Sequence, residues 1–132
     1  MITPILTAVH TRLFASDDLA TEVGTRINYA RAPVGTVYPQ VIYFDVASRS
    51  EAVADYDKVK VQFSAWSVDK FQALRIQEII YRLFLRYRGT IGDVEVNWTQ
   101  LVDMAALPQD DPQLHGYQIR FELRVKGANI GD

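Results

Sequence analysis

Hydrophobic positions recur along the N-terminal part of the chain at a spacing of three and four residues. Over residues 3–15 this spacing predicts an amphipathic helix. Its apolar stripe consists of Ile5, Leu6, Val9, Leu13 and Phe14. Ser16, Asp17 and Asp18 interrupt the stripe and are suited to cap a short turn from Leu19 to Val23, which Gly24 would end.

The same helical spacing is strongest over residues 69–88. The apolar stripe of this longer helix is Ala73, Ile76, Ile80, Leu83, Phe84 and Tyr87. Asp69 with Gln72 resembles a capping box, and Gly89 is typical of a helix stop. Its arginines, which could meet phosphates, are Arg75, Arg82, Arg86 and Arg88. Glu78, placed four residues before Arg82, favours instead a solvated, self-paired helix face.

Elsewhere the pattern alternates, which predicts half-buried strands near residues 58–66, 93–102 and 116–126. In the first of these, Val59, Val61 and Phe63 face inward between lysines and glutamine, and Trp66 falls on the polar side as an exposed aromatic. The charged segments SRSEAVADYD, at 48–57, and MAALPQDDPQLH, at 104–115, are predicted to be loops.

A further strand, at 40–47, is apolar on both faces. Val41 and Tyr43 point one way, and Ile42, Phe44 and Val46 the other. One face is expected to pack under the long helix. The other needs a second cover, either the N-terminal helix or a neighbouring subunit. Exposed Tyr29, Tyr38 and Trp66 favour the neighbour, because aromatic rings are enriched in interface cores.

These elements predict an α+β fold in the order α-β-β-α-β-β. About four strands form an antiparallel or mixed sheet, packed against the long helix and the N-terminal helix. The 132 residues are expected to make one domain, 1–132, with a flexible tail after residue 126.

Composition adds mainly exclusions. The net charge of −2 lacks the basic excess of a nucleic-acid binder. The chain has no cysteine, and His10 and His115 show no metal-ligand spacing, so no metal or cofactor is expected. RGTIGD, at 88–93, contains a GxxG but joins a helix to a strand rather than two helices. We find no catalytic motif, no leader and no membrane span, which predicts a soluble, non-enzymatic protein.

The segment RINYARAPVGTVYPQVIYF, at 26–44, resembles the tail terminator, or tail completion, family of long-tailed bacteriophages and prophages. The likeness rests on Arg26, Ile27 and Tyr29, on the step Ala32-Pro33, and on Pro39 opening an apolar strand. It continues through VKVQFSAWS and the amphipathic helix that follows. The segment 48–57 and the tail after 126 carry no match.

This resemblance implies a structural virion protein of the tail neck, assembled in the host bacterial cytoplasm. It implies a homo-oligomeric ring, usually a hexamer, that caps the head-proximal end of the tail tube, stops tube polymerisation and docks to the head connector. The implied partners are other copies, the tail tube protein and the head completion or connector protein. Genomic DNA would pass through the lumen without sequence-specific binding.

Candidate interface residues follow from exposed aromatics and from charged loops. They are Tyr29, Arg31, Tyr38, Trp66, Glu51, Asp55, Asp57, Asp110 and Asp111. The acids among them could alternatively line the lumen and repel DNA phosphates. Three other functions stay open: another neck component such as a head–tail joining or adaptor protein, a nucleic-acid-binding module that uses the helix arginines, and a small enzyme or ligand-binding domain.

Overall fold

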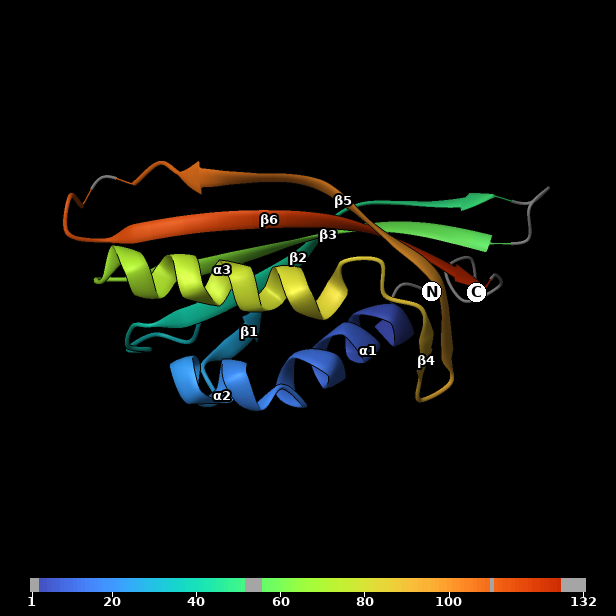
Figure 1. Ribbon diagram of the computed structural model, residues 1–132, viewed down its shortest axis with the longest axis horizontal. Coiled ribbons are helices and arrows are strands. Elements are labelled where there is room, and N and C mark those ends of the chain that lie inside the picture. Colours follow the sequence, from blue (N-terminus) through green and yellow to red (C-terminus); the bar gives the residue numbers. More distant parts are fainter. Residues whose placement is uncertain (1–2, 52–55, 110, 127–132) are drawn as a thin grey trace.

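The computed structural model describes residues 3–51, 56–109 and 111–126, of which residues 3, 47–51 and 56 are described by backbone alone. Three helices and six strands follow one another along the chain (Figure 1). Their bounds are α1 Thr3–Phe14, α2 Asp17–Val23, β1 Ile27–Tyr29, β2 Gln40–Glu51, β3 Tyr56–Ser67, α3 Lys70–Phe84, β4 Gly89–Ile91, β5 Val94–Leu107 and β6 His115–Lys126.

The helices begin and end close to where the sequence signals lie. Ser16 caps α2 by accepting a hydrogen bond from the backbone N–H of Leu19, and Gly24 closes the helix at a positive φ of 59°. Asp69 caps α3 by accepting from the N–H of Phe71. Gln72 does not complete a capping box directly, because its Oε1 accepts from the Ser67 hydroxyl, which in turn accepts from the N–H of Asp69.

The strands form one mixed sheet in the order β1-β2-β3-β6-β5-β4. The four long strands in the middle are antiparallel to their neighbours, whereas β1 runs parallel to β2. The β2–β3 pairing contains a bulge at Val46, and the β5–β6 pairing contains two, at Asn97 and at Val102. The sheet is strongly curved, and its long strands extend well past the C-terminal end of α3 (Figure 1).

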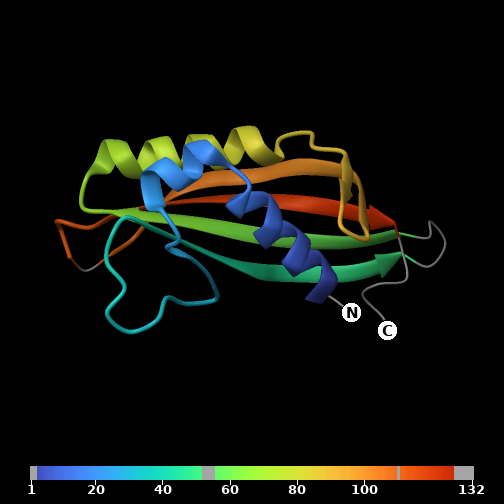
Figure 2. The same cartoon turned by 90° about the horizontal axis from the view of Figure 1, so that it is seen from below.

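All three helices cover the same face of the sheet (Figure 2). On this face Phe63 of β3 stacks on Phe84 of α3, with ring centroids 4.9 Å apart, and Tyr43 of β2 meets His10 of α1. The buried stripe of α1 is Ile5, Val9 and Leu13, and that of α3 is Ala73, Ile76, Ile80 and Phe84. The α+β class is therefore confirmed, and the opposite face of the sheet carries no helix in the described part of the chain.

Several sequence predictions need correction. The sheet has six strands rather than about four, because the three-residue strands β1 and β4 are too short to show a period. The predicted loop at 48–57 is mostly strand: β2 runs to Glu51 and β3 starts at Tyr56. Likewise β5 runs to Leu107, beyond the predicted start of its loop at 104. Residues 48–51 are polar, which a sequence pattern assigns to a loop, whereas residues 104–107 are apolar and lack the alternation that marks a half-buried strand.

Two helix predictions also differ. Helix α3 ends at Phe84 rather than 88, and Gly89 opens β4 instead of stopping the helix. The N-terminal helix does not cover the second face of β2, since it packs on Tyr43, which lies on the face under α3. Phe14 is 41% exposed and stacks on His10 rather than joining the core. The N-terminal helix is therefore not the cover of the second face, where Ile42 and Phe44 are half-buried and Val46 is exposed.

Candidate interaction surfaces

Loop 30–39 projects from one end of the sheet (Figure 2). It presents apolar side chains to solvent. Val34 at its tip is fully exposed, and Val37 and Tyr38 are 61% and 42% exposed. The base of the loop is fixed, because Arg26 Nε donates to the carbonyl oxygen of Pro39 over 2.7 Å. An apolar tip on an anchored base is typical of a docking loop on a rigid scaffold.

Tyr29 and Tyr43 link this loop to the helices. Tyr29 is 47% exposed and its hydroxyl donates to the carboxylate of Asp45, a bond that raises the pKa of Tyr29. Burial raises the pKa of Tyr43 to about 12, so its hydroxyl stays protonated and lies 2.7 Å from Nδ1 of His10. Burial also lowers the pKa of His10, which favours the neutral imidazole that can accept a hydrogen bond from this hydroxyl.

Trp66 is half-buried and packs on the neighbouring strand, contrary to the prediction of an exposed aromatic. Its ring lies over Gly116 of β6, where an added Cβ would come within 2.4 Å of Cζ3. Glycine at this position is therefore what allows the indole to lie flat on the sheet. The ring of Trp66 lies on the polar side of β3 and is still half-buried, because its cross-strand partner Gly116 has no side chain to hold the ring away from the sheet.

The predicted interface residues separate into two groups at opposite ends of the sheet. Trp66 pairs in register with Gln40 and Gly116, so it lies at the end that carries loop 30–39, together with Tyr29, Arg31 and Tyr38. Asp111 belongs to this end as well, in the exposed turn between β5 and β6, where its carboxylate accepts from the N–H of Gln113.

The remaining acids do not form the predicted charged loop. Asp57 is buried inside β3 at 2% exposure, and it lies at the far end of the sheet. Glu51 closes β2, with its side chain outside the description. Asp55 and Asp110 lie outside the described residues. Asp57 is therefore not among the acids that could face solvent in a lumen.

Sequence reasoning missed two apolar residues at the loop end. Val68 and Phe71, at the junction of β3 and α3, are 66% and 69% exposed. Phe71 lies off the buried stripe of α3, and that departure from the helical period is the signal that could have revealed it. With Val34, Val37 and Tyr38 they make this end of the molecule, which we call the apolar end, unusually rich in exposed apolar side chains.

The face of the sheet opposite the helices, which we call the open face, is polar in its middle. Arg120 donates through Nε to Gln62 and lies 3.6 Å from the carboxylate of Asp103. Other ion pairs on this face join Arg124 to Glu122 and Lys126 to Glu95. Because these charges are paired with one another, the open face does not present the continuous basic stripe of a nucleic-acid groove.

The outer edges of the sheet are only partly covered. β1 pairs with residues 41–43 of β2, and β4 pairs with residues 94–96 of β5. Arg86 N–H adds one bond to the carbonyl of Thr99. Beyond the bulges at Val46 and Val102, no described strand pairs with the outer edge of residues 47–51 of β2 or of residues 103–107 of β5 (Figure 1). We call these the β2 edge segment and the β5 edge segment.

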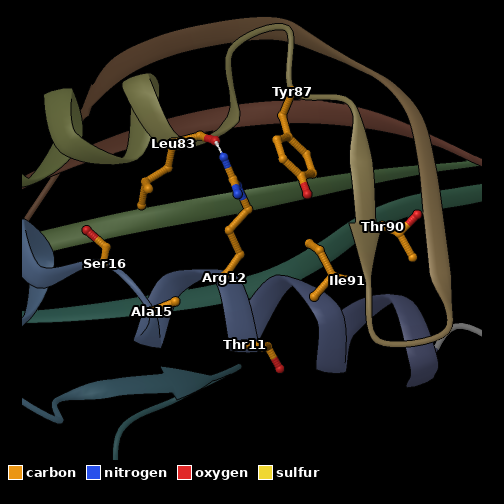
Figure 3. Close-up of a pocket in the computed structure, with 8 residues that line it drawn as sticks. All are labelled: Thr11, Arg12, Ala15, Ser16, Leu83, Tyr87, Thr90 and Ile91. Atoms are coloured by element: carbon orange, nitrogen blue, oxygen red, sulfur yellow. Dashed lines mark hydrogen bonds between the residues drawn. The ribbon is translucent and has the colours of Figure 1, made fainter.

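A pocket of about 290 Å³ lies between α1, the end of α3 and β4 (Figure 3). Arg12 enters it and donates from Nε and Nη2 to the carbonyl oxygen of Leu83, over 2.8 and 2.6 Å. Its guanidinium also stacks 3.6 Å from the ring centroid of Tyr87. This cation caps the C-terminal end of α3, which gives it a structural role.

The described residues contain no cluster of three or more side chains able to hold a metal ion. None of the helices in those residues is long and apolar enough to cross a membrane. The arginines of α3 pair with acids, as the sequence favoured: Arg82 with Glu78, and Arg75 with Glu22 of α2 at 3.3 Å.

No known family model matches the sequence, and no curated protein matches it. Among solved structures, the chain is similar to a protein in the virion of a native gene transfer agent particle. The two share 19% sequence identity with a TM-score of 0.76, over 92% of this chain and 93% of the other. At this identity the likeness shows that the fold is shared.

Proposed function

We propose that this chain is a structural component of a phage-like virion, and that it forms the ring that terminates the tail tube. The observation that carries the proposal is the shared fold, which extends over nearly all of both chains, one of them a virion component. The resemblance of residues 26–44 to tail terminators supports the same role from the sequence. The proposed role is structural rather than enzymatic.

The surface of the molecule suits an assembling subunit. Its apolar end would be costly to leave in water, and its sheet carries unpaired edge segments and a face without helices. The doubly apolar strand β2 fits this account, because Val41 and Tyr43 are buried on the face that carries the helices while Val46 on the bulge is 43% exposed. A neighbouring copy would cover what this chain leaves open.

In the proposed assembly, copies of the chain, six by expectation, close into a ring in the virion neck. One side of the ring would contact the tail tube protein and the other the head connector, and genomic DNA would pass through the lumen. We assign docking to the apolar end, with Tyr29, Arg31, Tyr38 and Asp111 among the contacts. Trp66 would act indirectly, by shaping β3 and β6 at that end.

The main competing role is a head–tail joining or adaptor protein with the same fold. Tail length separates the two. Particles produced without this protein should carry overlong tails if the chain stops tube growth. Tails of normal length that accumulate beside separate, filled heads would instead show that the chain joins heads to finished tails.

A further inference from the structure

The two edge segments are complementary in direction. Since β2, β3, β6 and β5 alternate in direction, β5 of one copy and β2 of the next run antiparallel when two sheets are set side by side in the same orientation. A contact between two different edges is heterologous, so it can repeat from copy to copy and close into a ring.

The β5 edge segment also lacks the usual protection against pairing. Long open strand edges are normally protected by charge, proline or extreme shortness. Residues 103–107 read DMAAL, and the one charge among them, Asp103, is bound by Gln118 and Arg120 of β6. Met104 is 42% exposed and the two alanines are exposed. Proline appears only at 108, after the segment ends.

Building on the proposed ring, we propose that neighbouring copies join by adding the β5 edge segment of one to the β2 edge segment of the next. The sheets of all copies would then form one closed β-barrel. Pairing the centres of the segments sets Ala105 opposite Arg49. These two positions belong to the same sheet face, since Ala105 pairs with Gln118 and Arg49 with Lys58, while Gln118 and Lys58 both alternate with core residues.

The stagger between the segments agrees with barrel geometry. Through the strand register, Ala105 lies at the same height in the sheet as Ser64 of β3, whereas Arg49 lies at the height of Lys58, about six residues away along β3. Setting Ala105 of one copy beside Arg49 of the next therefore shifts the second copy along the strands by about six residues, or about 20 Å at ~3.3 Å per residue. Each copy contributes four long strands, about 19 Å in width at ~4.8 Å per strand. The shift and the width give a strand tilt of about 45°, close to the 35–45° of closed barrels.

The direction of the shift decides which face lines the channel. Neighbouring strands twist with one hand, so a closed sheet coils in one sense only. Given the strand order seen from the helix side in Figure 1, a barrel with the helices outside requires the copy beyond β5 to shift toward the C-terminal end of β5. The free segment of β5 is its C-terminal end. The helices therefore lie outside, and the self-paired charges of the open face line the channel.

Cysteine cross-linking tests this pairing, since the native chain has no cysteine. Opposed residues of antiparallel strands have Cα atoms about 4.5–5.5 Å apart, within the reach of a disulfide. Oxidation of the double variant Arg49→Cys/Ala105→Cys should give a ladder of covalent oligomers that ends in a closed species. An equimolar mixture of the two single variants should give covalent dimers only. Oxidation traps even transient pairing, so the test does not need a stable ring.

Two controls make the result specific. Arg49→Cys combined with Glu95→Cys should stay monomeric, because Glu95 lies in the part of β5 that β4 covers. Dimers formed by Ala105→Cys alone would show β5 pairing with itself, and would overturn the inference. So would the absence of a ladder in the double variant. If sedimentation still finds a ring in that case, the proposed function stands and only the mode of joining fails.

Discussion

Adding a single methyl group at Gly116 should destabilise the protein, because the position is filled by the indole ring of Trp66. An ideal Cβ there would lie 2.4, 2.6 and 2.8 Å from three atoms of the ring. The backbone conformation of Gly116 is one that alanine adopts freely, so Gly116→Ala tests the contact alone. Forcing a methyl group into a packed contact of this kind costs about 1–3 kcal/mol.

This free energy is large enough to measure by thermal unfolding. At about 2.1 cal/mol/K of unfolding entropy per residue, a chain of this size should lose about 4–11 °C in Tm. The double variant Trp66→Leu/Gly116→Ala should be no less stable than Trp66→Leu, since leucine has no atoms at the contact. If Gly116→Ala melts with the native protein, then the ring does not lie on β6, and Trp66 is available to a partner as the sequence suggested.

Three further perturbations test other parts of the structure. Arg12→Met should lower the free energy of unfolding in urea by about 1.5–3 kcal/mol, since it removes the charged cap on the carbonyl of Leu83. The control Arg82→Met should change it by at most about 0.5 kcal/mol, and equal effects of the two variants would refute the capping role. Tyr38→Asp should block ring formation while its circular dichroism melt matches the native protein, and an unfolded variant would show that the exposed ring belongs to the core. Burial lowers the pKa of His10, so below pH ~6.5 the unfolded chain binds more protons than the folded protein. The stability contributed by His10 should therefore be full above that pH and fall as the pH drops. The variant His10→Gln should flatten this part of the Tm–pH profile, and an unchanged slope would contradict the prediction.

The helices and the long strands could be predicted from the sequence because each has a local cause. The stripe of Ile5, Val9 and Leu13, the caps at Ser16 and Asp69, and the alternation in β3 all act within a few residues. Each of these signals can therefore be read from residues that are close to it in the chain. The extent of the strands did not follow, because residues 48–51 and 104–107 owe their strand conformation to pairing with β3 and β6 across their hairpins, and not to an alternating pattern of their own.

The candidate surfaces were harder to predict for the same reason. Exposure of Tyr29 and Tyr38 could be inferred from a segment rich in proline and glycine. The burial of Trp66 depends on a glycine fifty residues away in the chain, which no local pattern contains. The edge segments depend on the strand order, and so they became visible only with the sheet.

The central claim, that this chain closes into a ring, is tested most directly by native mass spectrometry of the purified protein, alone and mixed with isolated tail tubes, with electron micrographs of the same samples. We expect a discrete species at a whole multiple of the 15.0 kDa chain, six being the expected number, seen end-on as closed rings or as caps on one end of the tubes. A strict monomer in both samples, with bare tube ends, would contradict the proposed function.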